Sequence, residues 1–98
     1  MTEQSTYTPF PDYTQEDIDA LVSFIQARVK PLRDAARYDS EDFKAFQALL
    51  DVTAHIKGSA QSELKRGDSP SLEFHHLALV ARQWDDHADF LPAWKPYG

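Results

Sequence analysis

The residue types best suited to chemistry gather in the last quarter of the sequence. Three histidines and three aspartates lie there: His75, His76, Asp85, Asp86, His87 and Asp89. Imidazole and carboxylate groups are ligands for zinc and similar divalent ions. A histidine oriented by an aspartate can also act as a general base, and His87 is the candidate for that role. The residues that could contribute to a metal site are His76, His87, Asp86 and Asp89.

The spacing of these residues does not complete a site. Neighbouring residues on a helix point about 100° apart, so His75 and His76 cannot readily share one ion. His76 and His87 lie about three helical turns apart, too far for a common ion unless the chain reverses between them. The sequence also has no glycine-rich phosphate loop and no nucleophile elbow. We therefore expect no metal, no cofactor and no catalytic residue, and retain a metal-dependent or His/Asp acid–base enzyme as an alternative.

A structural role explains the same histidines more simply. We expect His76 to pack at the edge of the core. We expect His87 to form a capping or other hydrogen bond where the third helix ends, with Asp86 or Asp89 nearby. Neither role requires a ligand.

Both ends of the sequence are rich in aromatic residues, which are rarely left in water. The six that flank the predicted helices are Tyr7, Phe10, Tyr13, Phe90, Trp94 and Tyr97. Two interpretations remain open: the ends fold over the bundle as a lid, or they dock a protein partner, and a homodimer combines both. In the second, Trp94 and Phe90 would be anchors, and His87 and Asp86 would hold the shape of the tail. The candidate interface residues are Trp94, Phe90, Tyr97, His87 and Asp86.

The elements that must position these residues are helical. Thr14 is a suitable N-cap for a helix over 14–38, because acidic residues follow it in the first turn. Pro31 falls inside this helix and predicts a kink or a break into two helices. The apolar stripe stays in phase beyond the proline, which favours the kink. Its members are Ile18, Leu21, Val22, Ile25, Val29, Leu32 and Ala36.

Two further helices are expected after short connections. Ser40 and Gly67 are the expected N-cap and C-cap of a helix over 40–66. Ser69, which a proline follows, is the expected N-cap of a helix over 69–85. The side of this third helix expected to face the core carries Leu72, His76, Leu77, Leu79, Val80 and Trp84.

The predicted fold class is all-α, because no useful stretch alternates with a period of two. Residues 1–98 form one domain, a three-helix bundle with a proline-kinked first helix. An extended tail over 1–13 precedes the bundle, and an irregular strap over 86–98 follows it. Phe24 and Phe74 lie off the main apolar stripes.

Four basic residues on the first predicted helix are a second candidate surface: Arg28, Lys30, Arg33 and Arg37. A three-helix bundle can present a helix-turn-helix to nucleic acid. Asp34 and Asp39 lie nearby, and the net charge of −6 opposes contact with phosphates. We expect these cations to complement the helix dipole on a solvated face, and retain nucleic-acid binding as a second alternative.

The amino-acid composition excludes several further kinds of site and function. The absence of cysteine excludes disulfides, thiolate catalysis and cysteine-ligated zinc, and fits a cytoplasmic location. No apolar run approaches the roughly 20 residues of a membrane span, and the polar first residues lack the character of a signal peptide. We therefore expect no contact with a membrane.

Two segments resemble a family of small actinobacterial proteins of unknown function. Residues 21–37 (LVSFIQARVKPLRDAAR) are similar to its opening LVAFLRARL-like helix, and 86–96 (DHADFLPAWKP) to its closing ADHPDYxPEWxP-like stretch. Ala88 and Phe90 replace the family's proline and tyrosine. The family's Thr-Pro-Gly-Pro-Trp segment is absent, and 43–67 has no counterpart. The resemblance implies an actinobacterial or actinophage origin and no established activity. We therefore expect a small, phage- or mobile-element-related interaction module that binds an unknown protein.

Overall fold

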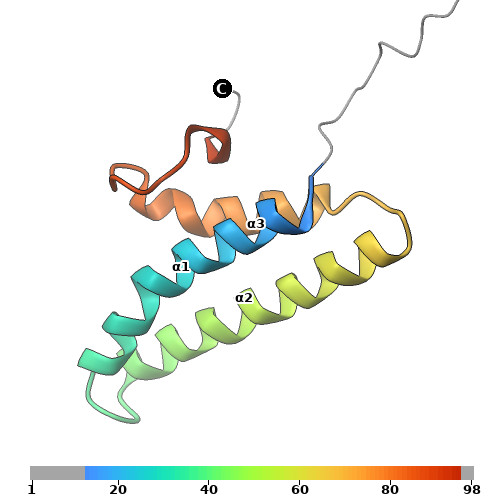
Figure 1. Ribbon diagram of the computed structural model, residues 1–98. Helices are drawn as coiled ribbons and strands as arrows, with labels where there is room; N and C mark the ends of the chain where they lie inside the picture. Colours follow the sequence, from blue (N-terminus) through green and yellow to red (C-terminus); the bar gives the residue numbers. More distant parts are fainter. Residues whose placement is uncertain (1–12, 96–98) are drawn as a thin grey trace, which may run out of the picture.

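In the computed structural model, which describes residues 13–95, the chain is all-α, and the predicted three-helix fold is confirmed (Figure 1). The tails over 1–12 and 96–98, Tyr97 included, lie outside the described residues. No helix of the described part is both long and apolar enough to cross a membrane. The elements are α1 (Gln15–Ala35), α2 (Glu41–Lys65), α3 (Ser71–Ala81) and the short 3-10 helices η2 (Arg82–Trp84) and η3 (Pro92–Trp94).

Helix α1 begins at the predicted N-cap. The Thr14 hydroxyl accepts a hydrogen bond from the Asp17 N–H (3.2 Å), and the Asp17 carboxylate accepts one from the Thr14 N–H (2.8 Å). This reciprocal capping box satisfies two backbone donors that the helix leaves free. The helix continues through Pro31, so a division into two helices is excluded, and its end bends from the line of its earlier turns (Figure 1).

Helix α1 ends three residues earlier than its pattern predicts. Ala36 is already extended, with a ψ of 149°. The chain must reverse within a few residues to start α2, and Asp39 takes a left-handed conformation there (φ 64°). Aspartate tolerates this conformation better than most residues, because its side chain can bond to the nearby backbone.

The predicted N-cap of α2 is confirmed, and Gly67 directly follows Arg66, which holds the C-cap position. The Ser40 hydroxyl accepts a hydrogen bond from the backbone at the third position of the helix (3.1 Å). Gly67 has a φ of 81°, and its N–H donates to the Leu64 carbonyl (3.1 Å). The Asp68 N–H donates to the Glu63 carbonyl (2.8 Å). These two bonds form a Schellman motif, which explains the glycine.

The predicted N-cap of α3 is wrong by one residue. Pro70, rather than Ser69, occupies the N-cap position, and no side chain caps the helix there. The Pro70 ring is fully buried, and its carbonyl accepts from the Phe74 N–H (2.8 Å). Burial of the ring therefore fixes the start of the helix where a serine cap was expected. The α-helical part ends at Ala81, and η2 extends it by one 3-10 turn.

The predicted core-facing side of α3 is only partly right: Leu77 is buried and Val80 and Trp84 pack against the core, but the other three residues do not face it. Leu72 and Leu79 are 65% and 55% exposed, and His76 is exposed as well. Large leucines point outward because small side chains at Ala78 and Ala81 let the opposite side approach α1 and α2. The residues of α3 that are buried are Glu73, Phe74, Leu77, Ala78 and Ala81.

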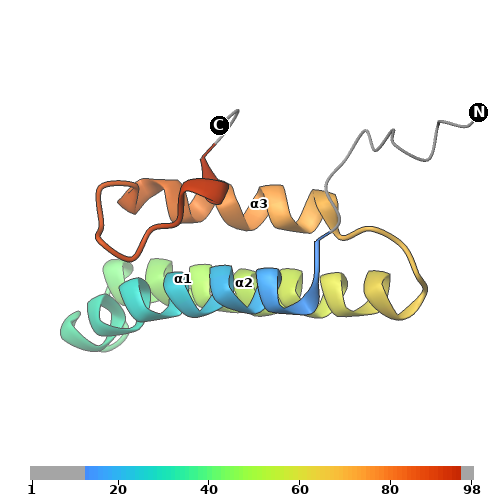
Figure 2. The ribbon, with the colours of Figure 1, turned by 45° about the horizontal axis from the view of Figure 1, so that its top comes forward.

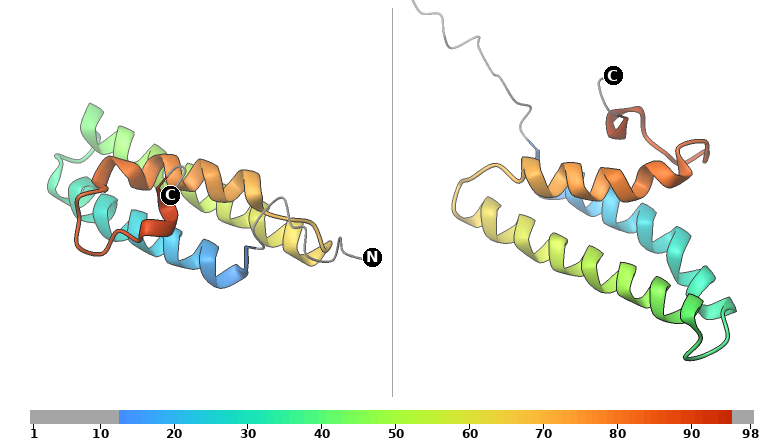
Figure 3. Two further views of the ribbon diagram at one scale, coloured as in Figure 1. Left: turned by 90° about the horizontal axis from the view of Figure 1, so that it is seen from above. Right: turned by 180° about the vertical axis from the view of Figure 1, so that it is seen from behind.

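Helices α1 and α2 lie side by side, and α3 lies across them as a second layer (Figure 2). The chain after α3 runs back over the same side of the bundle (Figure 3). The core between the layers is apolar apart from the buried Glu73 and Thr53, whose hydroxyl donates to the Leu49 carbonyl (2.8 Å). It is formed by Ile18, Leu21, Val22, Phe24, Ile25, Val29, Leu50, Ala60, Phe74, Leu77, Ala78, Ala81, Phe90 and Trp94.

Candidate functional site

The strap, defined here as residues 86–95, is the part of the chain that the sequence singled out for binding. Backbone hydrogen bonds set its turns: the His87 N–H donates to the Trp84 carbonyl, and the Phe90 N–H to the His87 carbonyl, both at 3.0 Å. Arg82 donates from Nε to the carbonyl oxygen of Trp94 (3.2 Å). The strap is therefore attached at both ends to the segment that follows α3.

Phe90 and Trp94 are buried in the protein's own core. Both rings pack against Phe24 on α1, with ring centroids 5.8 Å and 5.1 Å from it, and their own centroids are 5.3 Å apart. Their side chains are 8% and 4% exposed. These two candidate anchors are thus placed as a lid over the core. Phe24 completes the cluster. The sequence placed Phe24 and Phe74 off the main apolar stripes, but both side chains are buried in the core.

His87 forms a hydrogen bond just beyond the end of the third helix, as the structural interpretation predicts. Its Nδ1 accepts from the backbone N–H of Asp89 (3.0 Å), and its ring packs edge-on against Phe24 (5.7 Å). The carboxylates of Asp86 and Asp89 are exposed. The partner of His87 within the strap is therefore a backbone amide, and neither aspartate orients it as a base would require.

Arg28 reaches His87 from α1. Its Nη1 contacts His87 Nε2, and its guanidinium carbon lies 5.5 Å from the centre of the Phe24 ring. The Nε of Arg28 is buried and has no hydrogen-bond partner among residues 13–95. The sequence placed Arg28 on a basic, solvated surface and missed this contact, because no local pattern connects it with the strap.

A groove runs between α1 and the strap beside this contact. The hollow that Arg28 helps to line has a volume of about 330 Å³, and the strap lines it with Asp89, Leu91 and Trp94. An adjoining hollow of about 240 Å³ shares Leu91 and Trp94 and continues toward Tyr13. The side of the first hollow that belongs to α1 carries small residues: Ala20, Ser23 and Ala27.

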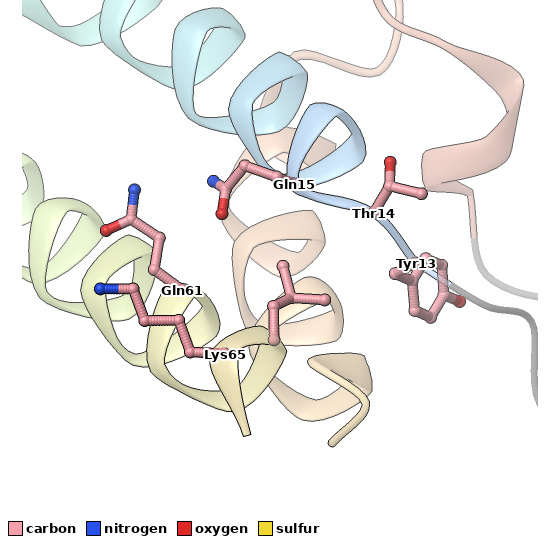
Figure 4. A pocket seen from close by; sticks show the side chains of 6 residues that line it. Tyr13, Thr14, Gln15, Gln61 and Lys65 are labelled. Carbon is pink, nitrogen blue, oxygen red and sulfur yellow. The ribbon is translucent and has the colours of Figure 1, made fainter. Parts of the chain in front are cut away.

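Another hollow, of about 650 Å³, lies between the first turn of α1 and the last turns of α2 (Figure 4). Gln15 and Gln61 line it from the two helices, and Lys65 is its one charged side chain. Its Thr14 hydroxyl already caps α1. Burial, and then the Asp17 carboxylate, raise the pKa of the adjoining Tyr13. The hollow thus combines neutral amides with a lysine and offers no carboxylate or imidazole as a general base.

The candidate metal ligands are not brought together in the described part of the chain. His76 is exposed on α3 and does not pack at the core edge, whereas His87 contacts Arg28. Asp86 and Asp89 are exposed on the strap. Across residues 13–95, no group of three or more histidine, aspartate or glutamate side chains is placed so that it could hold a metal ion.

The basic residues of α1 do not act as one surface. Arg28 faces the strap, and Arg33 pairs with Asp34 (3.0 Å) and donates to the amide oxygen of Gln47 (2.8 Å). Arg37 lies beyond the end of α1, and two of the three cations within the helix are therefore engaged inside the molecule. The geometry gives no support to nucleic-acid binding by this side of α1.

The outward face of α3 is an apolar surface that sequence reasoning assigned to the core. We define it by Leu72, His75, His76 and Leu79, all exposed and spaced so that they share one side of a helix. The single Asp, Glu, Lys or Arg of α3, Glu73, points the other way, is 8% exposed and accepts from the Ser59 hydroxyl (2.7 Å). The face therefore carries no aspartate, glutamate, lysine or arginine side chain from α3.

The two segments that carry the family resemblance meet at the junction of α1 and the strap. Phe24 and Arg28 come from 21–37, and the contacting His87 comes from 86–96. Comparison of the chain with models of known families, with curated proteins and with solved structures finds no match. The resemblance therefore stays a prediction.

Proposed function

We propose that this chain is a small non-enzymatic interaction module that binds another protein through the outward face of α3. The observation that carries the proposal is the exposure of Leu72 and Leu79, at 65% and 55%, two turns apart on a helix whose opposite side is already buried. A helix that is apolar on both sides is ordinarily covered on both sides. Single exposed leucines are common on protein surfaces, but an aligned pair with exposed His75 and His76 between them is a patch.

The chemistry of the face defines the chemistry of the partner. Covering each leucine fully would contribute up to about 2 kcal/mol, because the apolar area leaves water. The face offers no formal charge to pair with, and the chain around it carries a net charge of −6. The partner segment that fits is an apolar, uncharged helix face, packed ridge-into-groove against α3.

The strap takes a supporting role in this proposal. Phe90 and Trp94, the anchors first considered, are turned into the core, so they hold the bundle together. The hydrogen bond from Arg82 to the Trp94 carbonyl ties the end of the strap to the segment after α3. The strap thus helps to keep α3 in place while its outward face remains free for a partner.

Co-purification with matched variants tests the proposal. The full chain carries a tag in wild-type form, as the double variant Leu72→Ser, Leu79→Ser, and as the control Val52→Ser, whose side chain is 52% exposed on α2. We expect a protein that co-purifies in stoichiometric amount with wild type and with the control, and that is lost from the double variant. Retention by all three would contradict the role of α3.

Two further measurements complete this experiment. Circular dichroism melting should show all three proteins folded, because the replaced side chains make few core contacts. Light scattering of the purified chain tests whether the partner is a second copy of this chain. In that case the wild type is a dimer and the double variant is a monomer.

A further inference from the structure

We propose that the segment 7–12 of this same chain (YTPFPD) docks in the groove between α1 and the strap, with Phe10 and Tyr7 as its anchors. The groove consists of the two adjoining hollows, of about 240 Å³ and 330 Å³, that share Leu91 and Trp94. This site is separate from the outward face of α3, and it does not depend on the proposed function. It rests on the walls of the groove, on the place where the segment joins the described residues, and on a match of spacings.

The walls of the groove are mainly aromatic and aliphatic. Leu91 and Trp94 line both hollows from the strap. Phe74 adds an aromatic wall to the smaller hollow, and Phe24 adds one to the larger. Each hollow exceeds the roughly 150 Å³ of an apolar cavity that binds benzene. The groove therefore has room for an aromatic ring in each hollow, and covering its walls is favourable because apolar area leaves water.

The segment joins the described part of the chain at one end of this groove. Tyr13, the first described residue, lines the smaller hollow, and its ring stacks on Phe74 with the centroids 4.0 Å apart. The residues that precede Tyr13 are thus attached beside the groove, which gives them a high effective concentration there. Two prolines favour an extended path for 8–11, so a reversal toward the groove would fall at Asp12.

The spacing of the two anchors matches the spacing of two small residues on α1. Ala20 lines both hollows and Ala27 lines the larger one, and both residues are exposed. Seven residues of helix separate them, which corresponds to about 10 Å. Phe10 and Tyr7 are three residues apart, which corresponds to roughly 9 Å in an extended, proline-containing segment. With the segment antiparallel to α1, Phe10 would lie beside Ala20 and Tyr7 beside Ala27.

The charged residues of the groove fit neutral anchors. Arg28 and Asp89 line the hollow assigned to Tyr7. A tyrosine hydroxyl can donate to a carboxylate, and a guanidinium packs favourably on an aromatic face. Asp17 lines the hollow assigned to Phe10. Neither ring brings a negative charge to these carboxylates, so the segment avoids the repulsion that an anionic ligand would meet.

The hollow between α1 and α2 is a second place within reach, because Tyr13 lines it as well. Its walls are more polar: Gln15, Gln61 and Lys65 line it, and Leu64 is its aliphatic residue. An aromatic ring that covered these polar groups would remove their hydrogen bonds to water without replacing them. The groove beside the strap is therefore the better fit for two aromatic anchors.

Paramagnetic NMR on the full chain tests this placement. The sequence has no cysteine, so Thr6→Cys provides a single attachment point for a nitroxide, next to Tyr7. The nitroxide weakens the amide signals of residues that lie near it. We expect a strong loss of signal at Ser23 and Ala27, which line the groove, and a much smaller loss at Gln61, which lines the second hollow.

Variants on both sides of the contact connect the loss of signal with docking. In the labelled chain, the double variant Tyr7→Ser, Phe10→Ser removes both anchors and should restore the Ala27 signal. Ala27→Gln fills the groove from α1 and should restore the Ser23 signal, whereas the control Ala48→Gln, at an exposed position of α2, should not. Circular dichroism should show every variant folded, because none of the replaced side chains belongs to the described core.

A mixing experiment distinguishes docking within one chain from docking on a second copy. An isotope-enriched chain without the nitroxide is mixed with a nitroxide-labelled chain of natural isotope content, and we expect no loss of signal at Ala27. Such a loss in the mixture would overturn docking within one chain, because the segment would then reach a second copy. A loss at Ala27 no stronger than that at Gln61, or one that the double variant leaves unchanged, would overturn the assignment of the groove.

Discussion

Arg28 on α1 meets His87 in the strap, although 59 residues separate them in the sequence. The Arg28 guanidinium lies over the Phe24 ring, and the His87 ring packs nearly perpendicular to that ring. The strap is therefore joined to α1 by a polar contact and an aromatic cluster, and to the end of α3 by Arg82. These attachments fix the position of the strap, although it forms few of the backbone hydrogen bonds of a regular helix.

Removal of Trp94 should show that the strap is part of the core. Trp94→Ala should lower the free energy of unfolding by about 3–5 kcal/mol, because the side chain is 4% exposed and packs on Phe24. Urea denaturation followed by circular dichroism measures the change. The control Lys95→Ala, at the next and exposed position, should stay within about 0.5 kcal/mol of wild type. A melting temperature unchanged by Trp94→Ala would mean that the lid does not contribute to the core.

Two leucines test the orientation of α3. Leu77 is fully buried and Leu79 is 55% exposed, although both belong to the same helix. Leu77→Ala should lower the free energy of unfolding by about 2–5 kcal/mol, and Leu79→Ala by less than about 1 kcal/mol. Equal losses in denaturation experiments would contradict the placement of the helix faces.

Two serines test the helix caps. Ser40→Ala should destabilise the protein by about 1 kcal/mol, because it leaves a backbone N–H of α2 without its acceptor. Ser69→Ala should have almost no effect, since Pro70 holds the N-cap position of α3. If Ser69→Ala were the more damaging of the two in thermal melting, the assigned start of α3 would be wrong.

Two glycines should respond to alanine with opposite signs. Gly58 lies on the exposed side of α2, and a Cβ there would meet nothing within 4 Å, so Gly58→Ala should stabilise by about 0.5–1 kcal/mol. Gly67 has a φ of 81°, which alanine adopts with strain, so Gly67→Ala should destabilise by about 1 kcal/mol. The same sign for both variants in urea denaturation would contradict the Schellman assignment.

The features that the sequence predicts correctly are local. A cap such as Ser40 needs a hydroxyl beside the first turn, and Gly67 needs a left-handed backbone, so both can be recognised from a few neighbouring residues. The apolar stripe of α1 likewise sets its buried side from Ile18 to Val29, whereas Leu32, predicted to belong to the same stripe, is 41% exposed. The number of helices and the all-α class follow from such local patterns.

The features that the sequence misses depend on tertiary contacts. α3 is apolar on most sides, so its periodicity does not show which side faces inward. The choice depends on Ala78 and Ala81, whose small size permits close packing, and Leu72 and Leu79 are left outside. Arg28 is missed for the same reason, since nothing within its own helix indicates a contact with the strap.

Site-specific photo-crosslinking tests the central claim, that a partner protein covers the outward face of α3. A benzophenone amino acid replaces Leu79 in one version of the full chain and Val52 in another, and both are irradiated in cells of the source organism. We predict one abundant adduct through position 79 that is absent through position 52. The adduct should disappear when Leu72→Ser is added, because that residue belongs to the same face. The same set of adducts from both positions, or an adduct at 79 that Leu72→Ser does not reduce, would contradict the claim.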